Sequence, residues 1–180
     1  VSIGDRVAGI FAQGWIAGEP SQERTRATTL GSPLDGMLAE YVVLDQEGVV
    51  KLPPHLSYEA AATLPCAAVT AWTAVCKYRH LMAGETVLLQ GTGGVSIFAL
   101  QFAKLLGATV IITSSSDAKL ERAKALGADH TINYKEQPDW HKVARNITGK
   151  TGVDHIVEVG GAGTFEKSLA AVRILSLIHI

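Results

Sequence analysis

The chain has 180 residues, of which 47% are hydrophobic and 18% charged, a composition that can bury a core and excludes disorder over most of its length. Sixteen basic against 17 acidic residues leave a formal net charge of -1. Without a basic cluster, neither nucleic acid nor an anionic membrane surface is an expected partner.

The expected compartment is the cytoplasm. No apolar run reaches the ~18 to 20 residues that span a bilayer, and the first residues do not resemble a signal peptide. Cys66 and Cys76 are spaced ten residues apart, which fits neither a paired zinc motif nor a disulfide framework. The chain begins with Val1 rather than Met and ends in an apolar run, so we expect that both ends are cut.

Residues 1–56 are rich in glycine and proline and contain three short β-type runs, at 6–11, 39–44 and 48–52. They predict a partial all-β domain. The polar loop 14–36 between the first two runs is long enough that we expect it to be functional or mobile.

A bridging helical region follows. Ser57 precedes an Ala-rich stretch as an N-cap, and Pro65 opens a second helix that we expect to continue to about residue 78.

Beyond Gly84 the sequence alternates strands with helices. The expected strands are 86–90, 109–113, 131–133, 154–158 and 174–178, and the expected helices are 95–106, 117–126, 138–148 and 164–172. This alternation is typical of a parallel sheet covered on both faces. We therefore predict an α/β fold in which residues 57–180 form a doubly wound parallel (Rossmann) sheet.

The strongest chemical signal is the glycine-rich turn 91–96, between a predicted strand and a predicted helix. Gly91 allows a tight turn, Gly93 leaves room for a pyrophosphate, and the next helix points its free N–H groups at the phosphates. Ser96 stands where the pattern has its third glycine. The predicted pyrophosphate-binding residues are Gly91, Thr92, Gly93, Gly94 and Val95. The alternative is a turn at a helix start that binds nothing.

Serines follow the second strand of this unit, where an Asp or Glu would hold the ribose hydroxyls of NAD. Ser114 and Ser115 carry no charge to repel a 2′-phosphate, and Lys119 lies about one helical turn further on. This pattern favours NADP over NAD. The alternative is that the serines cap the next helix and Lys119 is a solvated surface lysine.

Two further positions complete the predicted cofactor site. Gly160 and Gly161 follow the fourth strand, where the backbone would approach the nicotinamide half, although a plain flexible loop explains them equally. Tyr134 follows the third strand and could pack beside the adenine ribose or remain a partly exposed aromatic.

Several segments together are similar to one family. They are the runs 4–7, 36–41, 70–72 and 91–95, followed by 126–130 and 132–134. In this order and spacing the chain resembles the medium-chain dehydrogenase/reductase superfamily, especially its quinone-oxidoreductase-like and alcohol-dehydrogenase-like members. The resemblance implies that residues 1–56 are part of a GroES-like catalytic domain, that 57–180 bind NAD(P), and that Thr70 contributes to the cofactor site.

The resemblance also implies missing parts. Family members are about twice this length, so the catalytic residues would mostly precede Val1 and are unknown here. We expect this piece alone to be inactive and the full-length protein to be a homo-oligomer. After Val172 and Arg173 the expected Pro-Gly-Gly turn is absent, so residues 174–180 are candidates for foreign sequence.

A zinc site in this chain would depend on its cysteines and histidines. Cys66 falls where zinc-dependent alcohol dehydrogenases carry a thiolate ligand, but a buried helix cysteine is the ordinary alternative. The four-cysteine zinc lobe of those enzymes is absent from 14–36, and the six histidines are scattered. We therefore expect no metal site in this chain.

The predicted function is an NADPH-dependent oxidoreductase that moves a hydride between nicotinamide and a quinone, enal, ketone or alcohol, each a small-molecule substrate. The alternatives are a zinc-dependent alcohol dehydrogenase and a dinucleotide-binding module without catalysis.

Overall fold

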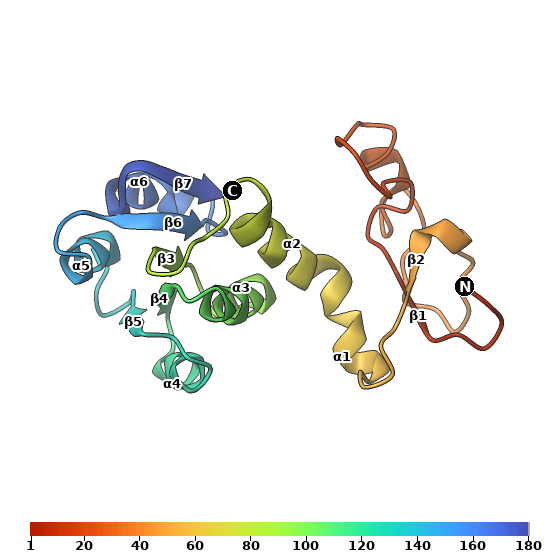
Figure 1. Cartoon of the computed structure of the whole chain (residues 1–180), viewed down its shortest axis with the longest axis horizontal. Helices are drawn as coiled ribbons and strands as arrows, with labels where there is room; N and C mark the ends of the chain where they lie inside the picture. Colours follow the sequence, from red (N-terminus) through yellow and green to blue (C-terminus); the bar gives the residue numbers. More distant parts are fainter. Residues whose placement is uncertain (180) are drawn as a thin grey trace. The chain divides into compact units, whose positions relative to one another are not determined.

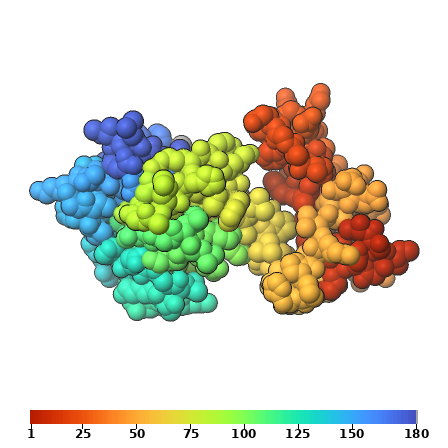
Figure 2. All heavy atoms as spheres, viewed as in Figure 1, coloured from red at the N-terminus to blue at the C-terminus, as the bar shows by residue number. Residues whose placement is uncertain are grey.

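The computed structural model describes residues 1–179, which divide into two compact units. The first unit is Val1–Cys66, and the second begins at Ala67 (Figure 1). In the space-filling view of Figure 2, the atoms of the second unit, from yellow-green to blue, pack into one body.

The first unit contains little regular structure. Strands β1 (Val7–Gly9) and β2 (Val49–Lys51) pair antiparallel, with Val7 opposite Lys51. These two strands lie within the predicted strands 6–11 and 48–52 and are shorter than predicted. Helix α1 (Tyr58–Ala62) begins after Ser57, whose hydroxyl accepts a hydrogen bond from the backbone N–H of Ala60 at 3.1 Å. The predicted N-cap is confirmed.

The predicted strand 39–44 is wrong. The structure has no strand there, and Leu38, Tyr41 and Val43 are exposed to solvent. A β-type run becomes a strand only when a neighbouring backbone pairs with it. Within residues 1–179, no strand pairs with this run.

The second predicted helix forms with wider turns than expected. Helix α2 (Val69–Trp72) lies between two π-helical segments, Leu64–Ala68 and Thr73–Lys77. Helical structure therefore covers nearly the whole predicted range 65–78, but nothing in the residue pattern predicts i to i+5 hydrogen bonding.

A five-stranded parallel sheet forms the centre of the second unit, in the order β5-β4-β3-β6-β7. Its strands are β3 (Thr86–Leu89), β4 (Thr109–Ser114), β5 (His130–Asn133), β6 (Val153–Val157) and β7 (Val172–His179). Its helices are α3 (Gly94–Leu105), α4 (Asp117–Ala125), α5 (Trp140–Ile147) and α6 (Ala162–Ala171). The predicted α/β fold with a parallel sheet is confirmed.

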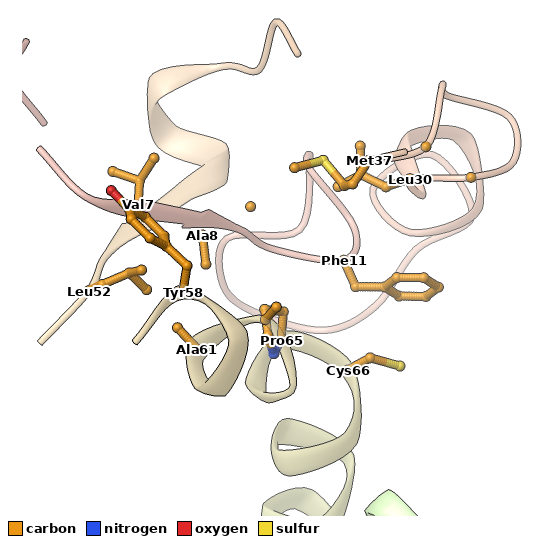
Figure 3. Close-up of a pocket in the computed structure, with 14 residues that line it drawn as sticks. Val7, Ala8, Phe11, Leu30, Met37, Leu52, Tyr58, Ala61, Pro65 and Cys66 are labelled. Carbon is orange, nitrogen blue, oxygen red and sulfur yellow. The ribbon is translucent and has the colours of Figure 1, made fainter. Parts of the chain in front are cut away.

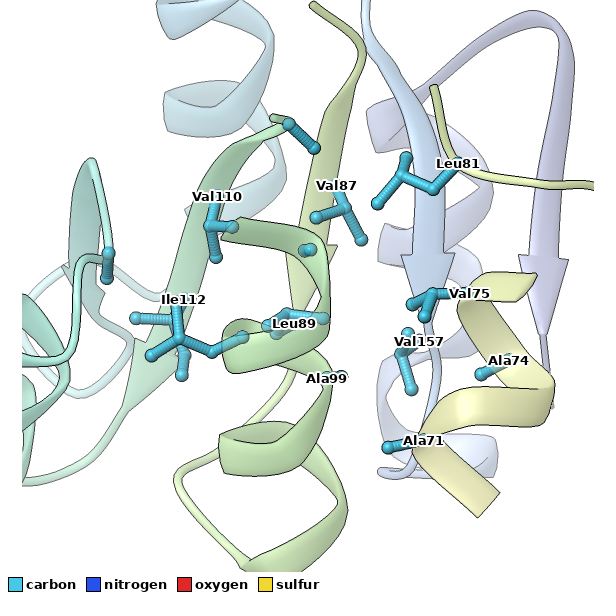
Figure 4. Close-up of a cluster of buried hydrophobic side chains, with 14 of the residues drawn as sticks. Ala71, Ala74, Val75, Leu81, Val87, Leu89, Ala99, Val110, Ile112 and Val157 are labelled. Atoms are coloured by element: carbon cyan, nitrogen blue, oxygen red, sulfur yellow. The ribbon is translucent and has the colours of Figure 1, made fainter. Parts of the chain in front are cut away.

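The two faces of this sheet are covered by different helices because alternate strand residues point to opposite faces. Val87 and Leu89 pack in one cluster with buried residues of α2, α3 and α4 (Figure 4). Leu88 packs in a second cluster with buried residues of α5 and α6. The strand order reverses direction between β3 and β6, so the loops after these two strands flank the switch point where ligands bind in such sheets. Within residues 1–179, every helix is too short or too polar to cross a membrane.

The last strand pairs irregularly with its neighbour. Val153 lies opposite Val172, but His155 lies opposite Leu177, so the register shifts between them. Leu175 has a φ of 60°, and Ile174 and Leu175 are exposed. The irregularity lies between Val172 and Leu177, in the stretch that contains Ile174 and Leu175.

Candidate functional site

The glycine-rich turn connects β3 to α3, as predicted. Gly91 has a φ of 72°, a left-handed conformation that favours glycine. Gly93 is the N-cap of α3, and a Cβ built there would meet no atom within 4 Å. The backbone of Gly93 therefore faces open space, and no packing among residues 1–179 explains the missing side chain.

The start of α3 is suited to an anion. The first backbone N–H groups of any helix lack intrahelical partners, and the positive end of its dipole lies there. No side chain caps this end of α3 among the described residues. A phosphate group would satisfy these N–H groups.

The remaining residues of the turn make packing contacts. A Cβ at Gly94 would lie 3.2 Å from the Cβ of Ala67, so glycine permits close packing there. Val95 packs against the core. The Ser96 hydroxyl is buried and donates to the carbonyl oxygen of Gln90 at 2.6 Å, which lets α3 lie close to the end of β3 although the third glycine is absent.

A cleft of about 420 Å³ opens at the carboxyl ends of the strands. It brings together three predicted site residues, Gly91, Tyr134 and Gly160. Its other lining residues are Gln90, Thr113, Pro138, Trp140, Val159, Gly163, Thr164 and Lys167. Tyr134 is 41% exposed, so its ring is available to a ligand.

The predicted 2′-phosphate residues lie outside the cleft lining. Ser114 ends β4, is 3% exposed, and its hydroxyl lies 3.2 Å from the Thr92 hydroxyl. Ser115 is half-buried, and Lys119 is an exposed residue of α4. Within residues 1–179, no side-chain cap bonds to α4, so the predicted alternative, in which the serines cap this helix, is not observed.

Six other predicted residues are also outside the cleft lining: Thr70, Thr92, Gly93, Gly94, Val95 and Gly161. Thr70 is an exposed residue of α2. Gly161 has a φ of 74°, and its N–H donates to a carboxylate oxygen of Glu158 at 3.0 Å. Gly160 has no room for a Cβ because the Thr164 side chain fills that space.

Asp117 was missed by sequence reasoning. It opens α4, and its carboxylate accepts a hydrogen bond from the Asn133 amide at 2.8 Å. This negative charge stands three residues after Ser114, in the region predicted to lack a carboxylate. Its position directly after the serine run was the available signal.

Gln90 and Glu158 were also missed. Both are buried, and their side chains are joined by a hydrogen bond of 2.7 Å between Nε2 of Gln90 and a carboxylate oxygen of Glu158. A Gln and a Glu placed directly after two buried strands were the signal that could have found them, since such positions meet at one edge of a parallel sheet.

The described residues do not fit a zinc ion. Cys66 lines a separate pocket of about 520 Å³ in the first unit, among Val7, Phe11, Met37 and other apolar or uncharged residues (Figure 3). It is the single thiol, imidazole or carboxylate in that lining. Across residues 1–179, no group of three or more His, Cys, Asp or Glu residues could hold a metal ion.

Comparison with known proteins shows that the chain is similar to dehydrogenases over most of its length. Residues 94–176 match the family described as zinc-binding dehydrogenase. A zinc-type alcohol dehydrogenase-like protein of Schizosaccharomyces pombe is 47% identical over 171 residues, which are 94% of this chain and 49% of the relative. The chain thus spans about half the length of this curated relative.

Solved structures agree with this fold. A putative alcohol dehydrogenase from Sinorhizobium meliloti is 50% identical, with a TM-score of 0.89 over 97% of this chain and 52% of that chain. An NAD-dependent alcohol dehydrogenase is 39% identical (TM-score 0.83; 97% and 52%). A quinone oxidoreductase of Pseudomonas syringae is 31% identical (TM-score 0.81; 99% and 48%).

The glycine-rich turn at the switch point of a parallel sheet and these matches over nearly the whole chain lead to one conclusion. The chain belongs to the medium-chain dehydrogenase/reductase superfamily.

Proposed function

We propose that the protein is an oxidoreductase that binds NAD(P) at the carboxyl edge of the parallel sheet. The single observation that carries this proposal is the open space at Gly93, at the uncapped start of α3. The bound cofactor would supply hydride transfer to or from a quinone, enal, ketone or alcohol. Because the chain spans about half of its relatives, this activity is proposed for the whole protein, with residues 1–56 as part of its GroES-like domain and 57–180 as its nucleotide-binding domain.

The chain's own residues would bind and orient the dinucleotide. The backbone from Gly91 to Val95 would hold the pyrophosphate, Tyr134 would pack beside the adenine ribose, and Gly160 and Gly161 would line the nicotinamide half. Thr92 and Ser114 are joined by their hydroxyls at 3.2 Å, which would couple the phosphate turn to the ribose end.

NADPH is the proposed preferred cofactor, and charge supports it. The hydroxyl of Ser115 has no hydrogen-bond partner among the described residues, and the same is true of the Lys119 ammonium. Both groups are thus available to a 2′-phosphate. Asp117 opposes this preference, but its carboxylate is already bonded to Asn133. One solved relative is described as NAD-dependent, so the choice between the cofactors needs its own experiment.

A zinc-dependent alcohol dehydrogenase is the second candidate because several relatives are described as zinc-type or zinc-binding. We favour a zinc-free reductase, since the four-cysteine zinc lobe of zinc-dependent members is absent from 14–36. Metal analysis of the full-length protein and of its Cys66→Ala variant separates the two. Stoichiometric zinc that is lost together with activity in Cys66→Ala would establish the zinc enzyme.

The Gly93→Val substitution in the full-length protein tests the proposed cofactor site. Gly93 has φ -81° and ψ 179°, which any residue adopts, and no atom lies within 4 Å of the position that a Cβ would take. The variant should therefore fold normally. Its side chain would occupy the phosphate space and weaken NADPH binding by about 2 kcal/mol, or roughly a 30-fold rise in Kd.

The matched control is Ala125→Val, which introduces the same valine side chain at an exposed position of α4, outside the glycine-rich turn. It should leave the Kd unchanged. A folded Gly93→Val protein with wild-type affinity for NADPH would contradict the site. Tight binding in the wild type without turnover of any quinone, enal, ketone or alcohol would instead indicate a non-catalytic dinucleotide-binding module.

A further inference from the structure

Glu158 is a buried carboxylate that has no cationic partner. It follows β6 directly, is 3% exposed, and forms no ion pair within residues 1–179. Five donors bond to its two oxygens. They are the backbone N–H groups of Gly160 (2.8 Å) and Gly161 (3.0 Å), the hydroxyls of Thr164 (2.6 Å) and Ser168, and Nε2 of Gln90 (2.7 Å).

These hydrogen bonds keep the carboxylate ionised. Burial alone would raise the pKa of Glu158, but the bonds from Ser168, Thr164 and Gln90 outweigh that effect and hold the pKa below its usual value. A buried charge is expensive unless it is fully hydrogen-bonded. The charge therefore holds its five donors in one arrangement.

Gln90 links this cluster to the glycine-rich turn. Its Nε2 donates to Glu158 and to Ser168, each at 2.7 Å, and its Oε1 accepts from the N–H of Gly160 at 3.1 Å. Its backbone carbonyl accepts from Ser96 at the start of α3. Gln90 thus bonds to the loop after β6 through its side chain, and to the start of α3 through its backbone carbonyl.

Both loops border the same cleft. Gln90 and Gly91 line it from the end of β3, and Gly160 and Thr164 line it from the end of β6. We propose that Glu158 and Gln90 are a positioning pair, whose interlocked side chains hold the two loops at the separation that dinucleotide binding requires. This inference rests on the proposed function, and neither residue is assigned a catalytic role.

Glu158→Gln disrupts the pair with little change in shape. The new amide would direct a donor at Nε2 of Gln90, which is itself a donor, so that bond is lost. Gln90→Glu would instead place two carboxylates in contact. In the double variant, residue 90 carries the carboxylate and residue 158 carries the amide. Every hydrogen bond of the cluster then has one donor and one acceptor again.

The matched control is Asp154→Asn, near the opposite end of β6. The Asp154 carboxylate also accepts two bonds, from the Thr86 N–H at 2.8 Å and from the Arg173 side chain. It does not line the cleft. Asp154→Asn removes a comparable structural interaction in β6. It therefore measures how a purely structural loss changes the Kd of the cofactor.

The experiment measures the NADPH Kd and the melting temperature of each full-length variant, with binding recorded well below that temperature. We expect Glu158→Gln to raise the Kd about tenfold or more. Asp154→Asn should lower the melting temperature while changing the Kd by less than about twofold. The double swap should recover a Kd within about threefold of the wild type.

Other outcomes overturn the inference. They are an unchanged Kd in Glu158→Gln, an equal rise in Asp154→Asn, or no recovery in a folded double swap. If Glu158→Gln does not fold, Ser168→Ala, which removes one donor at a fully buried position, should raise the Kd about threefold, and an unchanged value refutes the pair. Failure of the wild type to bind either NADPH or NADH contradicts the proposed function itself, and the pair with it.

Discussion

Two residues in the first turn of α4, Asp117 and Lys119, carry opposite charges. Asp117 is bonded to Asn133, whereas Lys119 has no ion pair in the described part of the chain. The lysine would attract a 2′-phosphate placed beside these residues, and the aspartate would repel it. The balance between these two side chains decides cofactor preference at this site.

Lys119→Ala in the full-length protein should weaken NADPH binding about tenfold and leave NADH binding nearly unchanged. A partly exposed contact between an ammonium and a phosphate contributes on the order of 1 to 2 kcal/mol, and NADH lacks the phosphate. Combining Lys119→Ala with Ser114→Asp should shift preference toward NADH. Titration with both cofactors provides the measurement.

Asp117→Asn is the complementary control, because it removes the repelling charge and keeps a side chain that can bond to Asn133. It should tighten NADPH and not NADH. Equal losses of both cofactors in Lys119→Ala would show that the lysine does not contact the 2′-phosphate, and an NADH preference in the wild type would overturn the assignment.

The sequence predicted these residue-scale features unevenly. Gly91 and Gly93 were identifiable because a strand, a glycine-rich turn and a helix follow one another locally. The bonds of Gln90 to Glu158 and Ser168 join residues 68 and 78 positions apart, so only the pairing of β3 with β6 brings them together. Asp117 was not predicted because the serines before it occupy the position at which the pattern places a carboxylate.

At the scale of elements, β3 and β6 are tied at both ends. Gln90 and Glu158 join their carboxyl ends, and at the other end Asp154 accepts from the N–H of Thr86, the first residue of β3. Burial favours the neutral acid, but the bonds from Thr86 and Arg173 outweigh it and hold the pKa of Asp154 below its usual value.

Asp154→Asn should therefore lower the free energy of unfolding by about 1 to 2 kcal/mol at neutral pH. Because the folded pKa is depressed, this stabilisation is fully present above the unfolded value of about 3.9 and is lost as pH falls through the folded pKa. The difference between wild type and variant should shrink in acid. Urea unfolding at pH 7 and below pH 4 measures it, and a difference that grows in acid would contradict the assigned ionisation.

Element prediction succeeded where burial on both faces constrains the chain. The strands and helices from β3 to α6 were found within a few residues, because their apolar runs alternate with amphipathic helices. The predicted strand 39–44 failed for the opposite reason. Its residues have strand propensity, but propensity supplies no pairing partner.

At the scale of the whole molecule, the first unit exposes many large apolar side chains. They include Ile3, Leu38, Tyr41, Val43 and Val50. Large amounts of exposed apolar surface favour association. The two-stranded sheet also leaves edges unpaired within this unit.

The isolated 180-residue polypeptide should therefore self-associate and show no turnover. Light scattering after size-exclusion chromatography measures the first property, and an NADPH oxidation assay with quinone and enal substrates measures the second. A monodisperse monomer that turns over substrate would show that these surfaces are stable in water and that the chain carries a complete site.

Ser96 has a consequence for how such sites are found. Its hydroxyl bonds to the carbonyl of Gln90 at 2.6 Å, which replaces the close glycine contact between helix and strand by a hydrogen bond. A search pattern that demands three glycines would pass over this chain, although its phosphate turn has the left-handed and the open glycine in place. Patterns that admit serine at the third position when a buried strand precedes it would recover sequences built in this way.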